Sequence, residues 1–407
     1  MAGLKKNIIN LVIVQLVTYI IPFLQIPYLT RILDIEIFGV YAYSLILIQI
    51  SNLILDFGFN LYYPQLIANN KNFNRIGKLI YSAIVIKIIL LIPIILFYFI
   101  LIINNALYNN YLLFFFFSFF SIIGNIFNFI WLYQGLEKLY IYSRVVIISK
   151  ILSLVAIFLF IKSKDDLVFL GIINSTQQIT IVLISIFWIT LNLKISPIKT
   201  NLKYIKVIAI KSFEFFFSRA FVTIYTSGCG LLIGNYGTST QMSIYSVADQ
   251  LYKAAQQIFS PVNQAIYPYM IRTKDYKKFY KILITCIVIC LVGCIIGWIW
   301  GSNIITLIYS KNYIPAIEVL NILLVALIFN IIAVLLGYPA LAPIGLSKIA
   351  NISVIYAGIL QIILFIAILQ LNRAQLHIYI AYTVIISEFT VMSIRYLALK
   401  RKNEKLQ

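Results

Sequence analysis

The sequence predicts an all-α integral membrane protein with about 12 transmembrane helices, arranged in two six-helix lobes around a central cavity. Two observations predict this class. Apolar stretches of about 20 residues, each enough to cross a hydrocarbon core of about 30 Å, recur along nearly the whole chain. Positive charge gathers in every second gap between them. With 62% hydrophobic and 11% charged residues, the chain leaves no material for a sizeable soluble domain.

The apolar stretches divide the chain into twelve predicted spans. They cover residues 8–29, 38–60, 79–103, 111–134, 145–161, 167–191, 212–234, 242–270, 282–308, 316–336, 350–370 and 378–397. The first stretch follows a short basic segment and has no small-residue cleavage site. We therefore expect it to be a span and not a cleaved signal peptide.

Lys and Arg are distributed unequally over the two sides of the membrane. The N-terminal segment, the tail (in which Arg395 is counted) and the gaps on their side hold 23 of the 32, whereas the opposite gaps hold five and the spans four. The positive-inside rule places the basic side in the cytoplasm. Both termini are thus expected to be cytoplasmic, which requires an even number of spans. Anionic headgroups account for the net charge of +20, so nucleic acid is not an expected partner.

The most basic long gap, residues 192–211, follows the sixth predicted span. It divides the chain into a predicted N-terminal lobe, 1–200, and a C-terminal lobe, 201–407. Many transporters that rock around a central site have this organisation. Prolines in three spans are expected to kink or interrupt helices, as they do where transporter helices line cavities. These are Pro22 and Pro27, Pro93, and Pro261 and Pro268.

Five spans carry polar or small residues spaced three or four apart, which places them on one helix face. The five stripes are Gln15, Thr18, Pro22 and Gln25; Gln49, Asn52, Asp56 and Asn60; Ser118, Ser121, Asn125 and Asn128; Arg219, Thr223, Thr226 and Gly230; and Asp249, Lys253, Gln256, Ser260 and Asn263. Any one stripe is equally well explained by hydrogen bonds between helices. Five stripes in both halves favour a shared aqueous cavity, because polar groups in hydrocarbon must pair or meet water.

Most of the charged residues within the spans have two interpretations. Asp249 and Lys253 can form an i,i+4 pair that only neutralises both, or Asp249 takes up a cation and frees Lys253 for an anion. Lys87 lies deep in its span and is expected to face the cavity. Arg219 either snorkels to the cytoplasmic surface or faces the cavity. Glu388 couples to an ion or is a protonated, hydrogen-bonded carboxyl.

The sequence lacks the motifs of common enzymes and pumps. It has one histidine and no Ser/His/Asp set, P-loop or dinucleotide motif. All four cysteines lie in spans, so no disulfide framework is expected. Cys286, Cys290 and Cys294 recur every fourth residue but have no His or acidic neighbours, so no metal site is expected. We expect no enzymatic activity and no cofactor, which leaves secondary transport.

Several segments carry a family resemblance: Ile26–Leu33 (IPYLTRIL), Ile37–Leu45 (IFGVYAYSL), Leu55–Asn60 (LDFGFN), Tyr245–Lys253 (YSVADQLYK), Ser260–Pro268 (SPVNQAIYP) and Gly337–Lys348. They resemble the Wzx-type O-antigen flippases, polysaccharide translocases of the superfamily that also contains multidrug exporters and the lipid II flippase. Two details depart from the family pattern. Asp34 stands where Gly is common, and Tyr62-Tyr-Pro-Gln replaces a segment that often carries a basic residue.

The resemblance implies a protein that flips undecaprenyl-pyrophosphate-linked O-antigen repeat units from the cytoplasmic to the periplasmic leaflet of the bacterial inner membrane. It implies alternating access coupled to an ion gradient. A large anionic headgroup requires a hydrated cavity with cationic anchors. Our candidate anchors for pyrophosphate or acidic sugars are Arg219, Lys253 and Lys87, with Arg31 at the outer mouth. Candidates for sugar hydroxyls are Gln15, Gln25, Asn52, Asn125, Asn128 and Gln256, and those for coupling to a proton or sodium ion are Asp249 and Glu388.

Expected partners are the lipid-linked oligosaccharide, membrane lipids, a glycan polymerase and a chain-length regulator. Two other functions stay open on the sequence. A small-molecule or multidrug exporter of the same superfamily would leave surface glycan intact. A membrane glycan polymerase or ligase would, when deleted, leave lipid-linked repeats on the periplasmic side.

Overall fold

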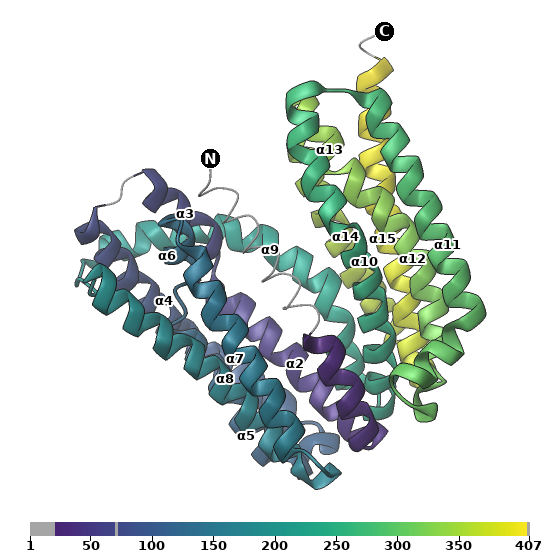
Figure 1. Cartoon of the computed structure of the whole chain (residues 1–407), viewed down its shortest axis with the longest axis horizontal. Coiled ribbons are helices and arrows are strands. Elements are labelled where there is room, and N and C mark those ends of the chain that lie inside the picture. Colours follow the sequence, from purple (N-terminus) through teal and green to yellow (C-terminus); the bar gives the residue numbers. More distant parts are fainter. Residues whose placement is uncertain (1–20, 70–71, 405–407) are drawn as a thin grey trace. The chain divides into compact units, whose positions relative to one another are not determined.

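The computed structural model describes residues 21–69 and 72–404, and this part of the chain contains helices and turns but no strand (Figure 1). Residues 21–32 are helical. The α-helices that follow are α2 (Ile35–Asp56), α3 (Phe59–Asn69), α4 (Phe73–Ile103), α5 (Leu112–Asn125), α6 (Ile130–Gly135), α7 (Leu139–Phe160), α8 (Leu167–Trp188), α9 (Leu202–Tyr236), α10 (Ser239–Thr273), α11 (Tyr276–Ile308), α12 (Ala316–Leu336), α13 (Tyr338–Leu341), α14 (Ser347–Ile368) and α15 (Leu376–Glu404).

Nine segments among the described residues are long and apolar enough to cross a membrane. Helices α9 and α10, with 35 residues each, are longer but more polar. The first predicted span extends into residues outside the described range. The predicted all-helical membrane class is confirmed, and the count of twelve spans and the position of the termini stay predictions.

The chain divides into two compact units. Unit 1 comprises Met1–Ile37 and Ser44–Ala220, and unit 2 comprises Phe38–Tyr43 and Phe221–Gln407. Helices α3 to α8 belong to unit 1 and α10 to α15 to unit 2, whereas α2 and α9 contribute residues to both. The two lobes predicted from the sequence, 1–200 and 201–407, stay a proposal.

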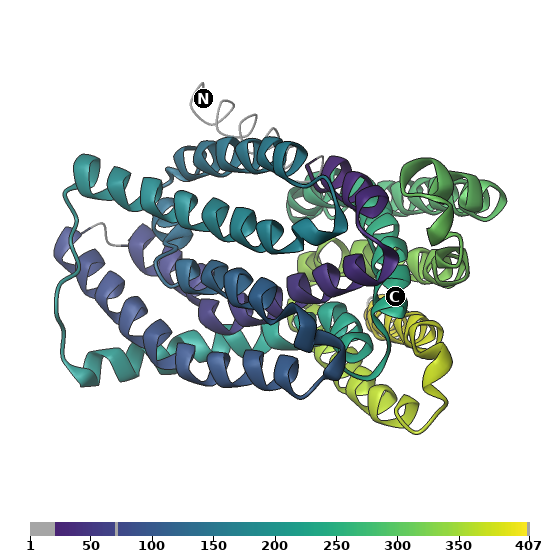
Figure 2. The same ribbon diagram turned by 90° about the horizontal axis from the view of Figure 1, so that it is seen from below.

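Unit 1 is held together by an apolar core between short and long helices. Helix α8 packs against α5 and α7, and α3 packs against α6 (Figures 1 and 2). The α3–α6 contact centres on Tyr63 and Trp131, which are fully buried, with ring centroids 4.7 Å apart in an edge-to-face arrangement. Such a pair contributes about 0.5–1.5 kcal/mol beyond its burial. It fixes two helices that are too short to be stable alone.

The predicted second span, 38–60, lies in Ile35–Ala68, one of the nine segments long and apolar enough to cross a membrane, but its helix ends at Asp56, where the chain turns. Phe57 has φ 44° and Gly58 has φ 80°, and α3 begins at the next residue. Glycine is required at position 58, because a Cβ there would clash with the carbonyl oxygen of Ser212 in unit 1. The predicted fourth span, 111–134, is also divided, since α5 ends at Asn125 and α6 begins at Ile130.

Unit 2 is built around α12, which packs against α15, α10 and α11. Helix α10 begins with a capping box, in which Thr238 Oγ1 accepts from the Gln241 N–H and Gln241 Oε1 accepts from the Thr238 N–H, both at 3.1 Å. The helix continues through Pro261 and Pro268. Similarly, α4 continues through Pro93. These prolines therefore do not interrupt their helices, and the expected kinks stay a prediction.

Two further sequence expectations are corrected. The predicted gap 192–211 is helical from Leu202, because α9 is much longer than its apolar portion. Arg395 does not lie in a solvated tail, because α15 continues to Glu404 and buries this side chain. Its Nη1 donates to the Ala333 carbonyl at 2.7 Å and its Nε to Ser353 Oγ at 2.9 Å. The guanidinium thereby connects α15 to α12 and α14.

Candidate functional site

Unit 2 contains a cavity of about 290 Å³ between its helices, lined by polar and apolar side chains. Its walls come from the unit 2 part of α9 and from α10, α12 and α15. The polar side chains that line it are Thr226, Cys229, Tyr245, Asp249, Tyr252, Lys253, Gln256, Gln257, Ser260, Asn263, Asn330 and Glu388. So many polar groups within a helical membrane protein make this cavity a candidate functional site, because they are costly in an apolar surrounding.

One face of α10 supplies much of this lining. Asp249, Lys253, Gln256, Ser260 and Asn263 are spaced three or four residues apart, and all five border the cavity. This spacing returns to the same side of a helix with 3.6 residues per turn. The α10 stripe noticed in the sequence therefore corresponds to one wall of the cavity.

Asp249 and Lys253 form an ion pair across one helical turn. The Lys253 ammonium lies 2.5 Å from Asp249 Oδ2, so the predicted i,i+4 pairing is confirmed. The two side chains are unequally covered, with Lys253 43% and Asp249 18% exposed. The carboxylate thus holds the ammonium at the cavity wall, while part of the lysine side chain stays exposed.

Glu388 of α15 is enclosed, with 3% of its surface exposed. Its Oε1 accepts from Asn330 Nδ2 at 2.8 Å and from the Tyr252 hydroxyl at 3.3 Å. These contacts bring together α15, α12 and α10. Both partners were missed in the sequence. Asn330 is the one side-chain amide in the second half of the apolar α12. A single amide in an apolar helix indicates a polar partner nearby, and this is how the sequence could have identified it.

A second polar cluster lies in unit 1, where α5 ends. The Lys87 ammonium of α4 donates to the backbone carbonyls of Asn125 at 3.0 Å and Asn128 at 3.2 Å. Asn125 Nδ2 donates to Asn52 Oδ1 at 2.9 Å, and the Tyr142 hydroxyl donates to Asn128 Oδ1 at 3.1 Å. The Asn125 carbonyl also accepts from the Asn128 backbone N–H at 3.2 Å, so the cation adds a second donor there and supplies a donor to the Asn128 carbonyl at the break. Lys87 is 3% exposed, so in this structure its ammonium binds protein and not a solvated cavity.

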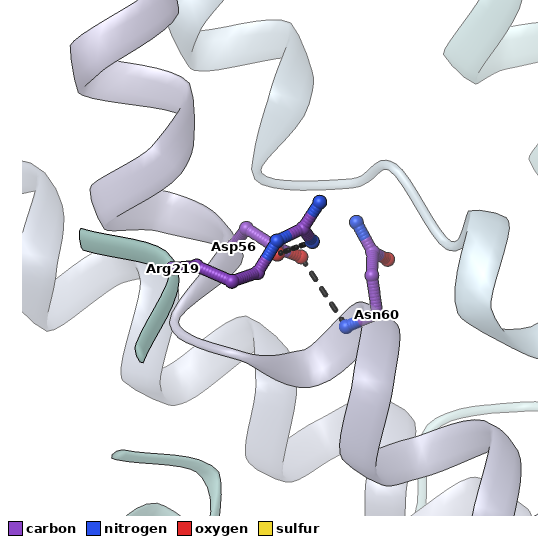
Figure 3. Close-up of polar contacts among 3 residues, drawn as sticks. All are labelled: Asp56, Asn60 and Arg219. Carbon is purple, nitrogen blue, oxygen red and sulfur yellow. Dashed lines mark hydrogen bonds and ion pairs between the residues drawn. The ribbon is translucent and has the colours of Figure 1, made fainter. Parts of the chain in front are cut away.

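A third polar cluster is the ion pair of Asp56 and Arg219, also in unit 1 (Figure 3). Arg219 Nη1 lies 3.2 Å from Asp56 Oδ2, and the Asn60 backbone N–H donates to Asp56 Oδ1 at 3.3 Å. Arg219 is 46% and Asp56 14% exposed. Asp56 was not singled out as the partner of Arg219, since the two are 163 residues apart and only the fold joins them.

The remaining candidates from the sequence are dispersed. Gln256 borders the unit 2 cavity. Gln25 is half-buried in the helix over residues 21–32, and Arg31 is exposed near the end of that helix. Gln15 lies outside the described residues. Within the described ranges no group of three or more His, Cys, Asp and Glu side chains is placed to hold a metal ion.

The fold and these polar sites define a multi-pass helical membrane protein. The family described as "Polysaccharide biosynthesis protein" matches residues 4–274. The chain therefore belongs to this family, which confirms the resemblance found in the sequence.

Known proteins agree with this assignment. A "Putative O-antigen transporter" of Shigella dysenteriae is 27% identical over 69% of this chain and 71% of its own length. A protein of the same name from Escherichia coli K12 is 24% identical over 65% of this chain and 64% of its own length. The second alignment thus covers less than two thirds of that relative.

Solved structures share the fold. The lipid II flippase MurJ in an inward closed conformation matches with a TM-score of 0.76 and 16% identity, over 96% of this chain and 87% of that chain. An inward-facing MATE family transporter of the MOP superfamily matches with a TM-score of 0.71 and 11% identity, over 98% of both chains. Identities this low compare the folds alone.

Proposed function

We propose that this protein flips undecaprenyl-pyrophosphate-linked O-antigen repeat units from the cytoplasmic to the periplasmic leaflet of the bacterial inner membrane. The observation that carries the proposal is the cavity of unit 2, in which a partly exposed Lys253 is held by Asp249. An amphiphilic anion needs such a site, because its charge must be stabilised within the membrane. The family and the names of the relatives support a polysaccharide as cargo.

In this proposal the cations bind the anionic part of the substrate. Lys253 and Arg219 are each held by one carboxylate yet remain about half exposed, so each can exchange that partner for a phosphate oxygen. Arg31 would bind the anionic headgroup at the outer mouth of the cavity. Lys87 can reach the substrate only if α5 and α6 move, because its donors now satisfy two backbone carbonyls.

The amide side chains would bind sugar hydroxyls. Gln256 already faces the unit 2 cavity. The amides of Asn52, Asn125 and Asn128 are engaged with protein partners, so they contribute only where a sugar replaces one of those bonds. The cavity of about 290 Å³ holds part of a glycan headgroup, and the lipid chain can remain in the bilayer.

Transport would be driven by a proton or sodium ion through Asp249 and Glu388. Release of Lys253 by protonation of Asp249, or by a cation bound to it, would couple ion uptake to anion binding. Glu388 lines the same cavity and accepts hydrogen bonds from Asn330 and Tyr252. A glycan polymerase and a chain-length regulator would act on the product at the periplasmic face, and two lobes would alternate access.

The deciding experiment locates lipid-linked repeat units in a strain that lacks the gene. We expect them to accumulate in the cytoplasmic leaflet and to be relieved by the intact gene. Accumulation in the periplasmic leaflet would instead assign a polymerase or ligase. Absence of accumulation, together with altered resistance to small toxic compounds, would assign an exporter, which the MATE-like fold also accommodates.

A further inference from the structure

One end of unit 2 carries an apolar groove that the proposed transport does not use. It lies between the turn before α14, the first turn of α14 and the last turns of α15, and its volume is about 590 Å³. Its floor and walls are Leu346, Ile349, Ile394, Leu397 and Ala398. Figure 1 shows the end of α15, close to the C-terminus, at the same end of unit 2 as α13. Leu397 is 50% exposed, so the groove is open along the side of the helix.

The groove has a basic rim. Arg401 and Lys402, one turn beyond the apolar residues of α15, line it directly. Lys348, in the first turn of α14, is exposed next to the groove residue Ile349. Apolar lining followed by cations along one helix matches a lipid, whose acyl chains lie below its headgroup. The charge favours an anionic headgroup over a zwitterionic one, and basic pockets at the cytoplasmic ends of membrane helices bind such lipids.

We propose that this groove is a binding site for an anionic phospholipid of the bilayer, with acyl chain against Leu397 and Ala398 and headgroup phosphate on Arg401 and Lys402. The site fixes the end of α15 to the turn before α14. It lies on the side where the distribution of Lys and Arg places the cytoplasm. The proposal is independent of the transported substrate.

The test measures lipid binding to the purified full-length protein by native mass spectrometry after delipidation. Phosphatidylglycerol or cardiolipin is titrated against phosphatidylcholine with the same acyl chains. We expect the anionic lipid to bind roughly tenfold more tightly, since each nearby cation strengthens attachment to an anionic headgroup. Arg401→Gln with Lys402→Gln should reduce the ratio to about one.

Two further variants keep the test decisive. Lys277→Gln with Lys281→Gln removes two exposed cations from α11, also on the predicted cytoplasmic side, and should leave the preference intact. Ala398→Trp should fill the groove and weaken both lipids even if the charge variant does not fold. The proposal is overturned if wild-type protein binds both lipids equally, if the preference survives loss of Arg401 and Lys402, or if Ala398→Trp changes nothing. Displacement of the anionic lipid by tighter-binding undecaprenyl phosphate would also overturn it, because the groove would then belong to the substrate.

Discussion

Lys253 is the residue on which the proposed function depends most directly. Lys253→Ala removes the partly exposed cation and leaves Asp249 without its partner, so we expect surface O-antigen to fall at least tenfold at unchanged abundance in the membrane. Lys253→Arg, which keeps the charge, should retain part of the activity. Lys277→Ala, an exposed lysine outside the cavity, is the matched control. Normal surface glycan in Lys253→Ala would refute the assignment.

Glu388 tests ion coupling at the same cavity. Glu388→Gln keeps an oxygen that can accept from Asn330 and Tyr252 but removes the ionisable group, so the fold should survive while transport loses its dependence on an ion gradient. The measurement is transport into proteoliposomes with and without imposed proton and sodium gradients. Glu318→Gln, an exposed carboxyl in the first turn of α12, should behave as wild type. Unchanged gradient dependence in Glu388→Gln would remove this residue from the coupling scheme.

Lys87 binds where the predicted fourth span divides into α5 and α6, and we expect this contact to stabilise the protein. Lys87→Met removes a donor from both carbonyls, of which only that of Asn125 keeps a backbone donor, the Asn128 N–H, so it should lower the free energy of unfolding by roughly 1–3 kcal/mol. The thermal midpoint of the purified protein measures this. Lys78→Met, exposed on the same helix, should have little effect. Equal midpoints for both variants would show that the break between α5 and α6 is stable without the ammonium.

We expect substitution of two glycines to have different effects on stability, because only Gly58 lies in the turn between α2 and α3. Gly58→Ala places a Cβ against the Ser212 carbonyl at a positive φ, so it should cost at least about 1 kcal/mol of stability. Gly293→Ala lies inside α11 with nothing within 4 Å of the added Cβ, and should be neutral or stabilising. Thermal unfolding of the two variants in the same detergent compares them. Similar midpoints would mean that the turn at Gly58 tolerates a side chain.

The positions of the membrane helices could be predicted from the composition of the sequence, whereas the breaks within them could not. Long apolar runs locate membrane helices because the bilayer demands them, and the stripe on α10 located the cavity wall because its spacing is local. The break after Asp56 depends on the approach of Ser212, far away in the sequence. Lys87 binds backbone carbonyls, which every residue has, so no sequence pattern identifies its partners. Arg395 resembled a tail residue because only the packing of α12 and α14 reveals its burial.

At the scale of the whole molecule, the distribution of Lys and Arg predicts which ends of the helices face the cytoplasm. Lys277 lies in a gap on the basic side, and Lys311 in a gap on the opposite side; both are exposed. We therefore expect Lys311→Cys to react with a membrane-impermeant maleimide in spheroplasts, and Lys277→Cys to react only after permeabilisation.

The chain itself supplies the background control for this topology experiment. Its four cysteines are buried, so the parent protein should label weakly in both conditions. Reaction of Lys277→Cys in intact spheroplasts would show that the protein has the opposite orientation in the membrane. Inversion would move the groove at the end of α15 to the periplasmic face. The lipid site proposed at the end of α15 and the cytoplasmic termini both require the orientation in which Lys277 is protected, so this one pair of cysteines tests the orientation on which both depend.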